Sequence, residues 1–196
     1  LAVRTGAEVL GLPAPEHGPQ DSSFRPTRLL HDGDTLETGE FTLEAVHTPG
    51  HASNHLCYRH AGTNWLVTGD HVIDGSTVVI NPPDGDMKQY VESLQRLRAM
   101  HCEALLPGHG ERIDDPGRAI DWIIEHRLLR ESRVLAAVQQ HPRLTPHELV
   151  PYVYQDVSAH LFRLAERSLL AHLLKLEQDG AVSRHQDAWF ADDGHG

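Results

Sequence analysis

Three short stretches of similar design decide how this sequence folds: TPGH at 48–51, GDH at 69–71 and PGHG at 107–110. Each places a metal-capable side chain directly after an expected strand. Open α/β sheets build sites at the C-terminal ends of their strands, where rigid strands fix the geometry of the loops. Imidazole and carboxylate groups suit zinc, and a carboxylate can bridge two cations. The pattern therefore predicts that His51, Asp70 and His109 bind metal, with Asp70 as the catalytic carboxylate.

Three further histidines lie close to these motifs. His47 stands on the strand side of the first motif and is expected to position its loop. His55 and His71 either orient metal ligands through hydrogen bonds or are ordinary structural histidines, because most histidines are exposed or satisfied by hydrogen bonds. The sequence leaves both interpretations open.

The segment up to about residue 112 predicts a layered α/β domain. Strand and helix patterns alternate there, separated by Gly, Pro and Asp. An amphipathic helix is expected over 87–100, since apolar residues recur three and four apart and Asp86 with Gln89 supplies an N-terminal cap. The expected strands cover residues 41–47, 64–68, 76–80 and 103–106, after a short apolar run at 7–12.

After residue 116 helices replace strands. A long helix is expected over 119–140, and Thr145 with Glu148 forms a capping box that starts a second one. A third helix over 158–178 and a hairpin over 181–190 complete the order that is typical of a winged helix. We therefore expect two domains, covering residues 1–116 and 117–196.

Arginines recur at helical spacing in the first of these helices, at Arg127, Arg130 and Arg133. If the stripe faces the metal cleft, Arg127 and Arg130 are expected to bind a phosphate or carboxylate of the substrate. The alternative is a solvated face paired with Glu131 and nearby acids. Both interpretations fit the pattern.

The three motifs, in this order, resemble the third, fourth and fifth metal motifs of the metallo-β-lactamase superfamily. The resemblance implies the C-terminal part of an αβ/βα sandwich. It also implies a dinuclear zinc site in which His51 serves one ion, His109 the other, and Asp70 bridges them, with a bridging hydroxide as nucleophile. Residues 126–131 and 171–180 resemble the helical C-terminal domain of the lactamase-β-like-2 group, which includes a mitochondrial endoribonuclease. That likeness implies a winged-helix-like tail and adds single-stranded RNA to the candidate substrates.

One metal motif of the superfamily, HxHxDH, is missing from this sequence. Without it neither metal reaches the three protein ligands that are typical of catalytic zinc. We therefore expect this chain to be N-terminally incomplete, to bind zinc poorly or not at all, and to be inactive as it stands.

The net charge and amino-acid composition argue against some classes of function and location. The formal net charge of -11 opposes non-specific attraction to nucleic acid or to an anionic membrane. No apolar run approaches the roughly 20 residues of a membrane-spanning helix, and the N-terminus lacks the apolar core of a signal peptide. Cys57 and Cys102 form no CxxC pair, which favours a reducing compartment. These features predict a soluble, cytoplasmic protein, with a homodimer as one arrangement.

The substrate stays open at this stage. The same scaffold serves esters, thioesters, lactams, lactones and phosphodiesters, so fold and metals do not choose among them. A different class of function is nucleic-acid binding through the winged-helix tail. Its third helix offers Arg163, Arg167 and Lys175 against Glu166 and Glu177, which is weak for a recognition helix. A structural role for the tail is therefore favoured.

Overall fold

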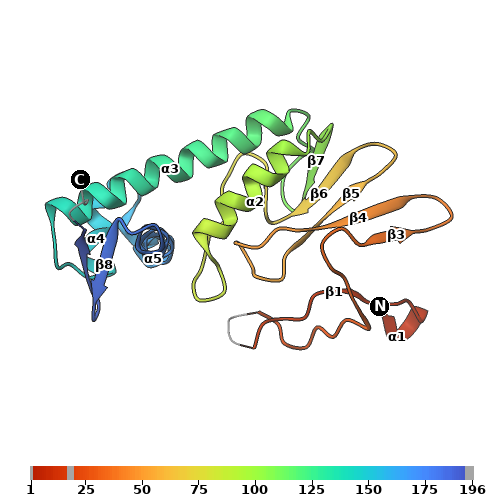
Figure 1. Cartoon of the computed structure of the whole chain (residues 1–196), viewed down its shortest axis with the longest axis horizontal. Coiled ribbons are helices and arrows are strands. Elements are labelled where there is room, and N and C mark those ends of the chain that lie inside the picture. Colours follow the sequence, from red (N-terminus) through yellow and green to blue (C-terminus); the bar gives the residue numbers. More distant parts are fainter. Residues whose placement is uncertain (1, 17–19, 193–196) are drawn as a thin grey trace.

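A five-stranded mixed sheet forms the centre of the larger unit in the computed structural model, which describes residues 2–16 and 20–192 (Figure 1). β4 and β6 both run antiparallel to β5, which lies between them, and β7 runs parallel to β6. β4, β6 and β7 therefore point the same way, and their C-terminal ends lie at one edge of the sheet. In spatial order the strands are β3 (Thr35–Glu37), β4 (Thr42–His47), β5 (Leu56–His60), β6 (Trp65–Gly69) and β7 (Ala104–Pro107).

The N-terminal segment, red in Figure 1, lies beside this sheet and does not join it. It holds a short helix α1 (Ala2–Thr5) and a parallel pair, β1 (Leu10–Gly11) and β2 (Arg28–Leu29). The expected apolar run at 7–12 thus contributes only a two-residue strand.

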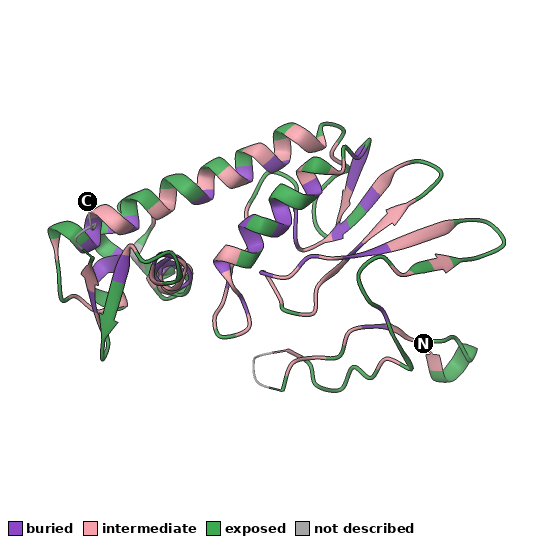
Figure 2. Ribbon diagram, in the orientation of Figure 1, coloured by how far each residue is buried: buried purple, intermediate pink, exposed green. Residues whose placement is uncertain are grey.

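Helix α2 (Met87–Ala99) covers one face of the sheet, and its apolar stripe explains why. Tyr90 and Leu94 are fully buried and join Leu66 and Leu105 of the sheet in one core. Figure 2 shows this buried stripe in purple along the helix. The Asp86 side chain accepts a hydrogen bond from the Gln89 backbone N–H, so the predicted cap is confirmed.

Helix α3 (Pro116–Gln140) is 25 residues long and contributes to two cores. Ile120 and Ile123 pack in the sheet core, whereas Val134 and Val138 pack in a second core near the C-terminus. The helix starts three residues before the expected position, because Asp115 caps it and Pro116 suits its first turn. The domain boundary at residue 116 stays a prediction, because α3 begins there and contributes side chains to both cores.

The second core belongs to a winged-helix unit. After α3 come α4 (Pro146–Val153), a 3-10 turn (Ala159–Leu161), α5 (Phe162–Gln178), and a hairpin of β8 (Val182–His185) and β9 (Ala188–Ala191). The capping box of Thr145 and Glu148 is confirmed, with both reciprocal hydrogen bonds formed. A layered α/β unit followed by a small helical winged-helix unit was expected, and this architecture is confirmed. Of the described helices, none is both long and apolar enough to cross a membrane.

One expected strand is absent from the structure. The segment 76–80 is irregular, although Ile80 is fully buried. The carbonyls of Val78 and Val79 accept hydrogen bonds from the side chains of Arg127 and His51, where a strand would pair with a neighbouring strand. Conversely, β2, β3 and β5 were not expected. For β5 the reason is that its sequence LCYRH lacks a clean apolar alternation.

Candidate metal site

The second and third motifs meet at the C-terminal edge of the sheet. β6 and β7 are parallel neighbours, and Gly69 pairs with Pro107 where the two strands end. The Gly108 backbone N–H donates to the Gly69 carbonyl at 2.8 Å, which joins the two turns. As a result, Oδ1 of Asp70 lies 3.5 Å from Nε2 of His109, with both side chains partly open to solvent.

Close approach of these turns explains the glycine before His109. A Cβ at Gly108 would lie 3.0 Å from Oδ1 of Asp70 and 3.2 Å from the carbonyl carbon of Gly69. A larger residue at this position would therefore require the Asp70 carboxylate and the Gly69 turn to shift.

His51 comes from the loop after β4, at the same edge. Its Nδ1–H donates to the Val79 carbonyl at 2.9 Å, which leaves the Nε2 lone pair available for a metal ion. Gly50 has a φ of 135°, and a Cβ there would lie 2.3 Å from the Cα of Tyr90. Only glycine lets the loop rest this closely on α2.

His55 is coupled electrostatically to the expected ligands. Its Nδ1 lies 2.8 Å from Oγ1 of Thr48, within hydrogen-bonding distance. Burial lowers the pKa of His55 to about 4, helped by the charge of His51 and opposed by that of Asp70. The ring is therefore neutral at pH 7 and adds no positive charge to the site.

His71 is fully buried, and neither ring nitrogen has a hydrogen-bond partner among the described residues. Its ring packs against those of His55 and Tyr90, at centroid distances of 5.5 and 4.8 Å. Burial, with the charges of His55 and His51, holds its pKa well below the ordinary value. In this structure His71 therefore makes packing contacts and no hydrogen bond to an expected ligand.

His47 holds the first motif's loop from its strand end. Its Nε2–H donates to the Ser53 carbonyl at 2.9 Å, and its backbone N–H donates to Asp32 at 2.8 Å. Both contacts fit the expected positioning role.

The donor chemistry of this edge suits a divalent metal, but the number of donors does not complete a site. Nowhere in residues 2–16 and 20–192 do three or more His, Cys, Asp or Glu side chains form a group able to hold an ion. Catalytic zinc takes three protein ligands and a water molecule. The paired Asp70 and His109, with His51 on the adjacent loop, therefore do not by themselves fit a complete zinc site, and their role as metal ligands stays a prediction.

The arginine stripe runs from the interior to the surface, since Arg127 is buried whereas Arg133 is exposed and lies 3.6 Å from Asp156, as the solvated-face interpretation expects. Arg127 is only 4% exposed, donates to the Val78 carbonyl and lies 5.4 Å from the ring centroid of Tyr90. Arg130 pairs with Asp156 at 3.1 Å. The solvated-face interpretation is therefore wrong for Arg127, and Glu131 pairs with Lys175 instead of with the stripe. Substrate binding by Arg127 and Arg130 stays a prediction.

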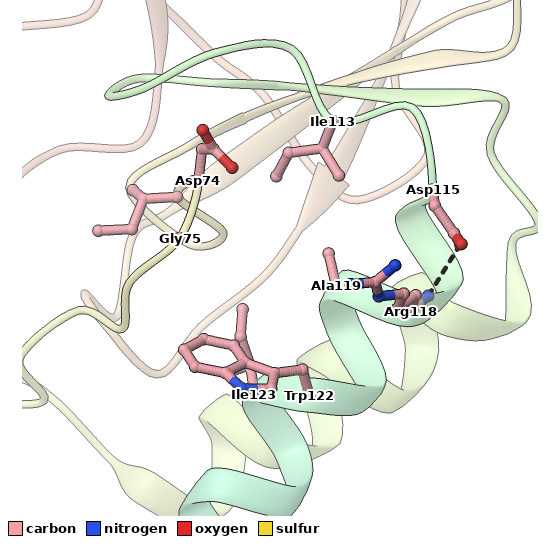
Figure 3. A pocket seen from close by; sticks show the side chains of 9 residues that line it. Asp74, Gly75, Ile113, Asp115, Arg118, Ala119, Trp122 and Ile123 are labelled. Carbon is pink, nitrogen blue, oxygen red and sulfur yellow. Dashed lines mark hydrogen bonds between the residues drawn. The ribbon is translucent and has the colours of Figure 1, made fainter.

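A hollow of about 360 Å³ lies between the first turns of α3 and residues 73–75 and 113 (Figure 3). Trp122 and Ile123 of α3 form one wall, opposite Ile113 and Asp74. The Asp74 backbone N–H donates to the His109 carbonyl at 3.4 Å, which connects this wall to the PGHG loop. Sequence reasoning did not identify Asp74 or Trp122, and the only signal near Asp74 was ordinary turn chemistry with Gly75.

Comparisons with known proteins agree with this arrangement. The model of the metallo-beta-lactamase superfamily matches residues 2–109, and that of the beta-lactamase associated winged helix domain matches residues 145–189. A Drosophila melanogaster protein called Beta-lactamase-like protein 2 homolog is 31% identical over 88% of this chain and 58% of its own length. An Aspergillus fumigatus protein called Atrochrysone carboxyl ACP thioesterase is 27% identical over 84% of this chain and 56% of its own.

A solved structure extends the likeness to three dimensions. A metallo-beta-lactamase family protein from Thermus thermophilus superposes with a TM-score of 0.74 at 26% identity, covering 90% of this chain and 56% of that one. The chain thus spans little more than half the length of these relatives.

Proposed function

Because the chain belongs to the metallo-β-lactamase superfamily and carries its winged-helix domain, we propose that the protein is a metal-dependent hydrolase whose two-metal centre takes His51, Asp70 and His109 from this chain. The observation that carries the proposal is the convergence of all three motif loops at one sheet edge, with Asp70 and His109 in direct contact. Zinc is the expected metal. Since three donors do not complete two zinc sites, the centre needs further ligands besides this set.

The residues of this chain have distinct roles in that proposal. The Val79 carbonyl accepts from Nδ1 of His51, so Nε2 keeps its lone pair for a metal ion, and the partly exposed carboxylate of Asp70 would bridge the two ions. Because His55 is neutral at pH 7, it does not offset the negative charge of Asp70. Bound divalent ions would supply Lewis-acid activation and a source of hydroxide near neutral pH.

The substrate class that we propose is an acyl ester or thioester. The thioesterase name of one relative supports it, and the net charge of -11 opposes RNA, whose phosphates attract basic surfaces. On the winged helix, Lys175 pairs with Glu131 and Asp179, and Arg184 lies 3.8 Å from Glu177. Among the described residues this leaves Arg143, Arg163 and Arg167 outside any ion pair, which is a small number of free cations for a nucleic-acid surface. We assign the winged helix a structural role on these grounds.

Metal content tests the two-metal assignment. We would measure zinc by mass spectrometry in the 196-residue chain and in a form extended upstream, each with His51→Ala and His109→Ala variants. The extended form is expected to bind about two ions and each variant fewer. His185→Ala, an exposed histidine on β8, is the matched control and should keep the full content. An extended form that holds no more zinc than the short one would contradict the assignment.

Activity of the extended protein tests the substrate class. The zinc-loaded form is expected to hydrolyse an acyl thioester of N-acetylcysteamine faster than it cleaves a single-stranded RNA oligonucleotide. Asp70→Asn should abolish the hydrolysis. RNA cleavage that exceeds thioester hydrolysis and is lost in the same variant would replace the acyl proposal with a ribonuclease.

A further inference from the structure

Arg127 is a buried cation without a carboxylate partner. It is 4% exposed, and no ion pair among the described residues includes it. Its Nη2 donates to the Val78 carbonyl, but its Nε has no hydrogen-bond partner within the same part of the chain. Burying an unpaired charge is costly, so buried cations are normally matched by an anion. This side chain therefore has both a charge and a donor to offer a ligand.

Arg127 lines a cavity of about 200 Å³ between α3, α5 and residues 77–79. His126 is a second member of the lining, and its buried Nδ1 is also without a partner in residues 2–16 and 20–192. Arg130 lines the cavity too, but Asp156 already neutralises it at 3.1 Å. Arg127 and His126 thus each bring a nitrogen without a hydrogen-bond partner to the lining of this cavity.

The rest of the wall is largely apolar. Val78, Val157, Leu161 and Leu164 contribute to it, and the two leucines remain more than 40% exposed. The cavity is smaller than the roughly 300–1,000 Å³ of sites for drug-sized ligands. It therefore suits only one end of a larger molecule. Its unpartnered nitrogens and apolar wall match an anionic group on a short apolar stem.

We propose that this cavity binds the carboxylate end of the acyl substrate or product, with Arg127 and His126 as the recognising donors. The apolar wall favours a carboxylate on a hydrocarbon stem over a phosphate, which has oxygens on every side. Assignment of the ligand as a substrate rests on the proposed function, whereas the binding of a carboxylate does not.

The backbone links the cavity to the metal-ligand loop. The Val78 carbonyl accepts from Arg127, and the carbonyl of the next residue, Val79, accepts from Nδ1 of His51. Consecutive peptide groups thus hold the anion-binding cation and an expected metal ligand. A carboxylate in the cavity would lie beside the segment that orients His51, as a substrate subsite requires.

The test is calorimetric titration of the 196-residue chain with hexanoate, in the presence of a chelator so that no metal contributes. Saturable binding is expected, and the isosteric neutral amide, hexanamide, should bind at least about tenfold more weakly because charge-assisted hydrogen bonds are lost. Arg127→Gln should lower hexanoate affinity at least about tenfold. Arg133→Gln, on the same helix but outside the cavity, is the matched control and should leave the affinity unchanged.

Several outcomes would overturn the proposal: no saturable binding, equal affinity for hexanamide, or equal loss in the Arg133→Gln control. Tighter binding of inorganic phosphate than of hexanoate would overturn the carboxylate assignment. If Arg127→Gln does not fold, His126→Phe carries the test, because it keeps an aromatic ring beside Trp122 and removes only the donor. None of these outcomes depends on metal. Failure of this proposal can therefore be distinguished from failure of the two-metal assignment, which the metal-content experiment tests.

Discussion

Replacement of Gly50 by alanine tests whether the first motif is held against α2 as the structure describes. Gly50 has a φ of 135°, a backbone conformation that costs a residue with a Cβ about 1–2 kcal/mol. The new Cβ would also lie 2.3–2.5 Å from three atoms of Tyr90, two of them backbone. Since overpacking of this kind costs about 1–3 kcal/mol, the variant should lose about 2–5 kcal/mol in free energy of unfolding. The corresponding fall in Tm is roughly 4–20 °C.

The assay is urea unfolding followed by circular dichroism, with Gly33→Ala as the matched control. Gly33 also has a positive φ, of 83°, but a Cβ there would meet no atom within 4 Å. The control therefore carries the backbone strain alone, and its cost should stay at about 1–2 kcal/mol. The difference between the two variants isolates the contact with Tyr90. If Gly50→Ala is no less stable than Gly33→Ala, the close packing of the TPGH loop on α2 is refuted.

Three further substitutions probe the contacts around α3 and α5. Lys175→Met should lower the free energy of unfolding by about 1–3 kcal/mol in chemical unfolding, because the Glu131 carboxylate loses a charged partner. The control Lys88→Met removes an exposed ion pair and should lower it by less than about 1 kcal/mol, so equal losses would contradict the argument. Burial lowers the pKa of His172, so the unfolded chain takes up a proton more readily than the folded one, and the free energy of unfolding should fall as the pH drops below about 6.5. His172→Leu should make the free energy of unfolding less dependent on pH in that range, and an unchanged pH profile would contradict a role of His172. Thr145→Ala removes the capping box and should cost about 1 kcal/mol by thermal unfolding, and an unshifted midpoint would contradict the cap.

Helices α2 and α4 were predictable from sequence because local signals determine them, whereas the helix expected over 158–178 begins only at Phe162, after a 3-10 turn. Apolar spacing and a capping Asp86 located α2, and Thr145 with Glu148 located the start of α4. Both signals act within a few residues of chain, which is the range over which a sequence pattern can be interpreted directly.

The irregular segment 76–80 was not predictable for the opposite reason. Its Val, Val and Ile favour a strand, but its carbonyls accept hydrogen bonds from Arg127 and His51, which lie far away in sequence. Long-range partners of this kind override local preference. Part of the candidate site was predictable in the same sense. The motifs predicted that Asp70 and His109 lie at one edge of the sheet. The burial of His71 and Arg127 was not predictable, because it depends on the packing of α2 and α3 and not on a local motif.

The long helix α3 has a consequence for any attempt to divide this protein. Its first turns complete the core under the sheet and its last turns complete that of the winged helix, while Ala171 of α5 also packs in the sheet core. Excision of either unit would strip apolar side chains from the other and expose them to water. The two units should therefore melt as one cooperative block, and a protease should find its first cuts in surface loops and not at the junction between them.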